Sequence, residues 1–245
     1  GAHLAFWGGS LEGVSAPLQA RSKLDLSLLP LSCGWSSCSV SGQPSATVTL
    51  PPFERTSASN RLSVLLFGNQ GFSGSQRAFR SVSVGLFAQL RLLPAHQQWH
   101  IRDLSLSADS TLALAPGDYW VENLSMSARS NIRVIGEGTV RLHVMNNLST
   151  GLSTGINPGP QNRYDRSEQF VLIGYRDVRF GELSRVAATV YARDNVTLGT
   201  TARLEGDIAG ASVDLLLGSR GTAIDDTTRG QTDYGALCVN TLAPD

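Results

Sequence analysis

Lysine is almost absent from this chain, and charge of either sign is scarce. The 245 residues contain one lysine, Lys23, and equal totals of 20 basic and 20 acidic side chains, so the formal net charge is zero. Such a chain has no overall basic field that could hold nucleic acid or an anionic membrane surface. The sequence therefore predicts no nucleic-acid partner.

Long apolar runs are also lacking. No run approaches the roughly 20 residues that a membrane-spanning helix needs, so the sequence predicts no membrane insertion. Low charge combined with abundant Ser, Thr, Gly and Asn is typical of exported β-structured proteins. We therefore expect the protein to lie outside the cell or on the cell surface.

Cysteine is rare, with three in the chain. Cys33 and Cys38 enclose the short polar loop Gly34-Trp35-Ser36-Ser37, which favours a local disulfide formed in an oxidising compartment. On the chain-entropy estimate this bond would contribute about 2 kcal/mol. Free thiols are the alternative, and a metal site is a weaker one because no histidine lies nearby.

Histidine is equally scarce, and the usual catalytic motifs are missing. The four histidines are His3, His96, His100 and His143, and neither a GxSxG nor an HExxH pattern occurs. His143 falls at an outward-facing position of a predicted strand, so a surface histidine is expected there. Nothing in the sequence indicates a cofactor.

One short phrase returns throughout the middle of the chain. Residues 101–108, Ile-Arg-Asp-Leu-Ser-Leu-Ser-Ala, match residues 121–128, Val-Glu-Asn-Leu-Ser-Met-Ser-Ala, at a separation of 20. Shorter copies follow at Asn147–Ser149, Asp177–Gly181, Asn195–Gly199 and Ser212–Leu215. Repeats of this length indicate a solenoid in which each copy is one coil stacked on the last.

The phrase has the pattern of a strand rather than a helix. Apolar residues alternate with polar ones, as in Leu104 and Leu106 or Val196 and Leu198, so one face of each strand is expected to be buried. Turn-forming stretches such as Ala115–Asp118 and Glu205–Asp207 flank the copies. A coil of about 18–24 residues has room for three short strands. The predicted fold is all-β, a right-handed parallel β-helix.

The repeat also divides the chain. Residues 1–60 lack it and are expected to form an irregular leader that caps the first coil, because an open solenoid end invites aggregation. Residues 61–224 are the predicted β-solenoid. Residues 225–245 are polar and without periodicity, which suggests a linker or the start of a following domain.

Many β-helices act on polysaccharides with acidic side chains on one face, so an enzyme is the main alternative. Glycoside hydrolysis needs two carboxyls about 5–10 Å apart. The candidate acids are Asp177, Glu182, Asp194, Glu205, Asp207 and Asp214. Asp177 and Asn195 fall at equivalent places on neighbouring coils, as do Arg179 and Thr197. No two acids are predicted to stack, so solvated turn acids are the simpler interpretation.

One segment does not fit the coils. Residues 161–168 are long for a coil corner and rich in charge. Loops on rigid scaffolds often carry binding, and Arg and Tyr suit sugar or protein contacts. The candidate ligand-binding residues are Arg163, Tyr164, Asp165 and Arg166, and the alternative is a solvated excursion.

The order of several motifs resembles a known family. Leu114-Ala115-Pro116-Gly117-Asp118-Tyr119-Trp120, followed by Asn123-Leu124-Ser125 and Gly138–Val144, is similar to the β-solenoid region of the MshQ family of MSHA-pilus biogenesis proteins. Further similar stretches are Ile156-Asn157-Pro158, Phe170–Tyr175, Val190–Leu198, Gly206–Val213 and, before the solenoid, Cys38–Pro44 with Leu50–Phe53.

The resemblance implies a non-enzymatic β-solenoid module of an exported protein from a Gram-negative bacterium. It further implies a structural or adhesive role linked to a type IV pilus, with pilus or cell-surface proteins and surface glycans as partners. It brings no catalytic residues. A carbohydrate-binding or polysaccharide-cleaving β-helix is the alternative function.

Overall fold

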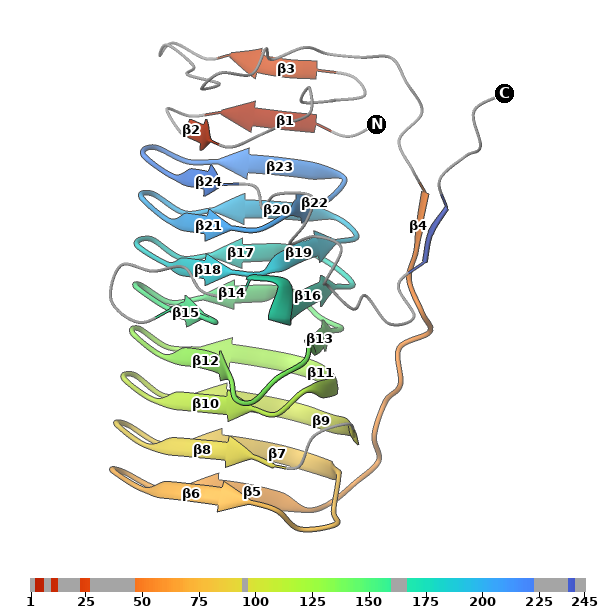
Figure 1. Ribbon diagram of the computed structural model, residues 1–245, viewed down its shortest axis with the longest axis vertical. Coiled ribbons are helices and arrows are strands. Elements are labelled where there is room, and N and C mark those ends of the chain that lie inside the picture. The colour runs from red at the N-terminus through yellow and green to blue at the C-terminus, as the bar shows by residue number, and fades with distance from the viewer. Residues whose placement is uncertain are drawn as a thin grey trace.

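A computed structural model describes residues 3–6, 10–12, 23–26, 47–93, 97–159, 167–222 and 238–240 of the chain. Within these ranges the structure consists of strands and one 3-10 turn, η1 (Ser167–Gln169). No helix in the described ranges is long and apolar enough to cross a bilayer. The strands stack in parallel as a β-solenoid of about eight coils, which confirms the predicted fold class (Figure 1).

Each coil contributes to two long sheets. In the first sheet, the early coils each supply one strand: β5 (Arg61–Val64), β7 (Ala78–Val84), β9 (Gln97–Leu106) and β11 (Gly117–Met126). The later coils each supply two: β13 (Val140–Val144) and β14 (Leu148–Thr150), β16 (Phe170–Gly174) and β17 (Val178–Phe180), β19 (Thr189–Ala192) and β20 (Asn195–Leu198), β22 (Ile208–Ala209) and β23 (Ser212–Leu215).

The second sheet takes one strand from each coil. The coils supply β6 (Asn69–Phe72), β8 (Gln89–Leu92), β10 (Thr111–Leu114), β12 (Asn131–Val134), β15 (Gly155–Ile156), β18 (Arg185–Ala187), β21 (Arg203–Glu205) and β24 (Arg220–Thr222), and β2 (Ser10–Glu12) adds a ninth strand at the end. The later coils thus have the three short strands that the length of the repeat predicts.

The strand register confirms that the repeated phrases are structural equivalents. Leu104 pairs with Leu124, and Ser125 pairs with Ser149 of the next coil. Val178 pairs with Val196, which in turn pairs with Val213. The alternating pattern therefore places the same face of every copy in the core.

The core is one continuous column of apolar side chains from Leu62 to Leu215. Large rings fill its first half, where Trp99 and Tyr119 are buried and stacked with their centroids 6.0 Å apart. Each buried side chain of this kind contributes about 1.5–3 kcal/mol, and stacked coils share the benefit across their interfaces.

A left-handed residue marks the turn between the two sheets in every coil. The non-glycine residues at this position have φ near +57°, and the last turn uses Gly218. They are Phe67, Phe87, Asp109, Arg129, Ser153, Leu183 and Thr201. The N–H of each bonds to the next coil's turn, as from Asp109 to the carbonyl of Ala128, so the turns form a row along the stack.

The N-terminal strands lie at the opposite end from the one expected. Strand β1 (His3–Phe6) pairs with β23 and with β3 (Lys23–Leu26), and β2 (Ser10–Glu12) pairs with β24. These strands therefore continue the stack beyond its last coil rather than covering the first one (Figure 1). The place of these strands differs from the expected cap over the first coil, because parallel pairing lets any strand with a suitable pattern extend an open edge.

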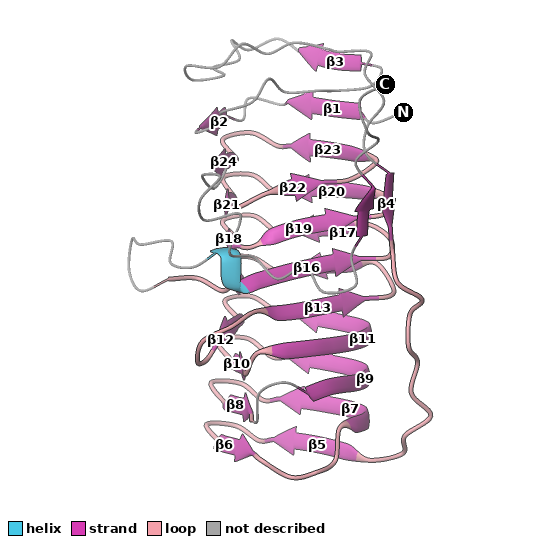
Figure 2. Cartoon of the chain, turned by 45° about the vertical axis from the view of Figure 1, so that its right-hand side comes forward, coloured by secondary structure: helices cyan, strands magenta, loops and turns pink. Residues whose placement is uncertain are grey.

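Residues 50–60, called the strap below, return the chain to the first coil along the outside of the stack (Figure 2). The strap follows β4 (Thr47–Thr49), which pairs in antiparallel fashion with β25 (Cys238–Asn240). Cys238 lies opposite Thr49 in this pair. The described residues of the C-terminal segment thus lie beside the start of the strap.

Candidate functional site

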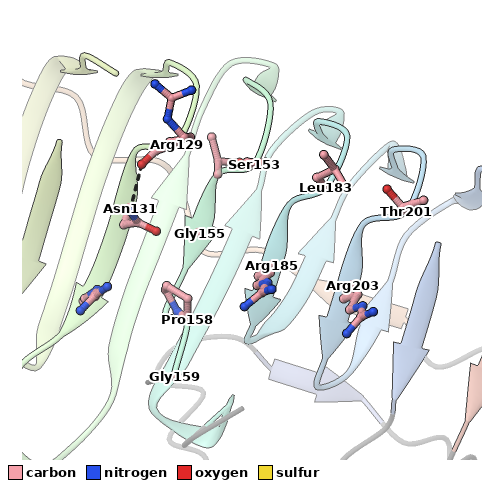
Figure 3. Close-up of a pocket in the computed structure, with 12 residues that line it drawn as sticks. Arg129, Asn131, Ser153, Gly155, Pro158, Gly159, Leu183, Arg185, Thr201 and Arg203 are labelled. Carbon is pink, nitrogen blue, oxygen red and sulfur yellow. Dashed lines mark hydrogen bonds between the residues drawn. The ribbon is translucent and has the colours of Figure 1, made fainter. Parts of the chain in front are cut away.

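A hollow on the described surface lies on the outer face of the second sheet. It has a volume of about 740 Å³ and spans β12, β15, β18 and β21. Arg129, Arg133, Arg185 and Arg203 all contribute to its lining (Figure 3), so it is called the arginine pocket below.

Strand alternation explains why these arginines point outward. The central residue of each short strand, such as Val186 or Leu204, is buried in the core. The arginine that precedes this residue on β18 and on β21 must then point away from the core, because successive side chains in a strand point to opposite faces. Arg185 pairs directly with Arg203, and Arg203 pairs with Arg220 of the next coil. Three arginines therefore occupy one outward row on consecutive coils, about 4.8 Å apart.

On the coil before Arg185, the same outward row holds a glycine, Gly155, which leaves space beside the arginines. Gly155 stands between Asn131 and Arg185 in register. A Cβ at Gly155 would lie 2.2 Å from Asn131 Oδ1 and 2.6 Å from Pro158 Cγ. Any larger residue would therefore displace the side chains that line this part of the pocket.

The charges in the pocket are only partly compensated. The Arg129 guanidinium donates two hydrogen bonds of 2.7 Å to the Asp109 carboxylate, and these bonds lower the pKa of Asp109. Among the described residues, no ion pair or hydrogen bond joins the side chains of Arg185 and Arg203 to any partner. Like charges directly opposite each other on neighbouring strands are destabilising. The arrangement can accept an anion, and guanidinium groups bind carboxylate, sulfate or phosphate through paired N–H donors.

A second polar cluster lies under the strap, on the outer face of the first sheet. The Arg141 guanidinium donates hydrogen bonds of 2.7 and 2.9 Å to the two carboxylate oxygens of Asp118. His143 Nε2 lies 3.6 Å from Asp118 Oδ1. Burial raises the pKa of Asp118, but the contacts with Arg141 and His143 outweigh it and hold that pKa far below its usual value.

Aromatic rings join this cluster to the strap. The rings of His143 and Trp120 stack with centroids 3.9 Å apart. Phe53 of the strap meets Trp120 and Tyr175 edge-on at 5.4 and 5.2 Å, and Tyr175 Oη donates a hydrogen bond of 2.6 Å to the carbonyl of Pro51. The strap is thus anchored on β11 and at the end of β16.

His143 is therefore not the surface residue that its position predicts. It does point away from the core, but it is only 3% exposed because the Trp120 ring stacks on it and the Tyr175 ring lies beside it. Its Nδ1, Trp120 Nε1 and Thr189 Oγ1 are buried without a hydrogen-bond partner among the described residues. The prediction failed because an outward side chain can still be covered by the neighbouring coil, on which Trp120 is the direct register partner of His143.

The strap also borders a smaller hollow of about 450 Å³. It is lined by Leu50–Phe53 together with Tyr175, Tyr191 and Arg193. Val171 and Ile173 are fully buried nearby and form a small apolar cluster separate from the core. The strap therefore covers apolar surface as well as the charged cluster.

The other predicted site residues have different outcomes. Arg163, Tyr164, Asp165 and Arg166 lie outside the described residues, as do Cys33 and Cys38, so the ligand-binding segment and the disulfide stay predictions. In the described part of the chain, no group of three or more His, Cys, Asp or Glu side chains is placed to hold a metal ion.

One of the acidic residues considered for catalysis, Asp177, has a structural role between coils. The Asp177 carboxylate accepts hydrogen bonds from the backbone and side-chain N–H groups of Asn195, which confirms their predicted equivalence on adjacent coils. Arg179 pairs with Thr197, also as predicted, and Thr197 pairs with Asp214. No two of the six candidate acids face each other in the described ladders.

Sequence reasoning missed Arg185 and Arg203, although a signal was present. Arg185-Val186-Ala187, Arg203-Leu204-Glu205 and Arg220-Gly221-Thr222 each begin with arginine and follow the repeated phrase at a constant distance. Aligning the second strand of each coil as carefully as the first would have revealed the row.

Comparisons of the chain with protein-family models, with curated proteins and with solved structures gave no match.

Proposed function

We propose that the chain is a non-enzymatic structural module of an exported bacterial protein. In this proposal it acts as a rigid spacer or presenting platform in a surface assembly linked to a type IV pilus of the MSHA kind. Its partners are pilus or cell-surface proteins. The resemblance to the MshQ family, carried by the motifs between Cys38 and Val213, is what suggests the pilus.

The unbroken column of coils supports the structural role. Parallel ladders run from coil to coil through both sheets, and a single core cluster extends along the whole stack. In such a solenoid each coil is held by its two neighbours, so the stack resists bending and separates what is attached at its two ends.

Protease treatment of intact cells tests the surface location. The full-length protein, carrying an epitope tag, would be expressed in the bacterium that encodes it. We expect added protease to remove the tag signal while a cytosolic control protein stays intact. Protection of the tag until the cells are broken would overturn the proposal.

Deletion of the gene tests the link to the pilus separately. We expect fewer assembled pili, counted by electron microscopy, and recovery when the gene is restored. Normal pili in a strain whose surface-exposed protein has been removed would overturn the pilus link and leave a surface module of another assembly.

A further inference from the structure

The row formed by Arg185, Arg203 and Arg220 is unusual for a chain of zero net charge. Arg185 and Arg203 are exposed and face each other directly across neighbouring strands. The nearest outward position on β21 holds one acid, Glu205, two residues from Arg203. Repulsion between adjacent arginines opposes folding, so their placement is better explained by a ligand than by stability.

We propose that the arginine pocket binds a linear acidic polysaccharide that lies along the stack and crosses several coils. Carboxylate or sulfate groups of successive sugars pair with Arg185 and Arg203. Arg133 lines the same pocket from β12, and Arg220 extends the row beyond it.

The geometry favours a polymer over a single small anion. The arginine residues repeat along the row with the spacing of the strands, about 4.8 Å, which is close to the length of one sugar unit in an extended chain. A repeating ligand can thus meet the same contact on each coil. Paired N–H donors of arginine suit planar carboxylates and sulfates, and each such bond is stronger than a neutral one.

The lining also favours a sugar polymer over a nucleic acid. Among the described residues that line the pocket, none has an aromatic side chain on which a base could stack, and stacking is the usual means of holding single strands. Leu183 and Pro158 provide apolar edges beside the charges. The zero net charge of the chain supplies no wider field for a duplex.

Binding of defined polymers to the purified chain tests the proposal. The probes are polygalacturonate for carboxylates, dextran sulfate for sulfates, uncharged dextran as the neutral control, and duplex DNA as the competing polyanion. We expect wild-type protein to bind at least one acidic polysaccharide, with an affinity that falls as salt rises, and to ignore dextran. Absence of binding to both acidic polysaccharides, or tighter binding to DNA than to either, would overturn the proposal.

Matched variants locate the site. Replacing Arg185 and Arg203 together with glutamine should weaken binding by about tenfold or more, since two charge-assisted contacts are lost. The control replaces Arg61 and Arg80, two exposed arginines of the first coils, with glutamine and changes the net charge equally. We expect the control to bind within about twofold of wild type. Equal losses in both double variants would show a non-specific charge effect and overturn the assignment.

Thermal unfolding of the same proteins gives an independent check. The R185Q/R203Q variant should melt no lower than wild type, because it removes repulsion between exposed like charges. A clearly lower melting temperature would mean that these arginines serve the fold, which would contradict a site kept for a ligand.

Discussion

Single residues determine how each coil turns from one sheet to the other. Seven turns place a non-glycine residue in the left-handed region, where a side chain costs about 1–2 kcal/mol relative to a right-handed conformation. Asn and Gly tolerate this region best. The chain nevertheless uses Phe, Arg, Leu and Thr there, so the turns carry strain that the stacked hydrogen bonds of the row must offset.

Relieving this strain should stabilise the protein. Replacing Leu183, which has φ of 58° and is 52% exposed, with asparagine should raise the free energy of unfolding by about 0.5–1 kcal/mol. Leu217 is similarly exposed, at 56%, but has no left-handed backbone, so Leu217→Asn is the control and should change stability by less than about 0.5 kcal/mol. Urea unfolding measures both, and equal effects would contradict the role of the backbone angle.

Among the elements, the strap is the one that links distant parts of the chain. Its Phe53 ring contacts both Trp120 and Tyr175, and Glu54 Oε2 lies 3.6 Å from His100 Nε2. Edge-to-face aromatic pairs of this kind contribute about 0.5–1.5 kcal/mol each beyond their buried area. Phe53 is therefore the strap side chain that joins two coils through its ring contacts.

Truncation of that side chain should release the strap without unfolding the coils. For Phe53→Ala we expect the free energy of strap opening to fall by about 1–3 kcal/mol, because two ring contacts and part of the buried area are lost. Hydrogen exchange measured by mass spectrometry should show faster exchange in peptides covering residues 50–60. Arg55→Ala, at an exposed neighbouring position, is the control. Unchanged exchange in the Phe53 variant would mean that other contacts hold the strap.

The cluster beneath the strap predicts a dependence on acid. Because contacts with Arg141 and His143 depress the pKa of Asp118, its contribution to stability is present above about pH 4 and is lost as pH falls toward the folded-state pKa. Asp118→Asn should cost about 1–3 kcal/mol near pH 6 and progressively less below about pH 4. Denaturant unfolding of wild type and Asp118→Asn between pH 3 and 7 measures this shrinking difference in the free energy of unfolding.

The exposed acid Asp109 provides the comparison. Its carboxylate is bonded to Arg129 at the surface, where solvent screens the pair, so Asp109→Asn should have a much smaller effect across the same range. A constant difference between wild type and Asp118→Asn at every pH would show that the asparagine perturbs packing and that the carboxylate charge is not the cause.

At the scale of the whole molecule, the repeat allowed the coils and their register to be predicted but not the surfaces. The pairing of Leu104 with Leu124 and of Val178 with Val196 follows from local alternation, which is visible in the sequence. The contacts of Phe53 with Trp120 and Tyr175 join segments that are far apart in the chain, and such contacts leave no periodic signal. The arginine pocket forms only when separate coils stack, so its residues are adjacent in space and not in sequence.

The strap also limits how this protein can change during evolution. Solenoids commonly gain or lose whole repeats, since an added coil needs only its two neighbours. Here an inserted coil would lengthen the stack by about 4.8 Å, whereas each strap residue spans at most about 3.3–3.6 Å. The strap must keep Phe53 on Trp120 and Tyr175 while still reaching β5 at the first coil. Duplication of a coil between those points would therefore require a matching insertion of one or two residues in the strap. The number of coils and the length of the strap must then change together during evolution.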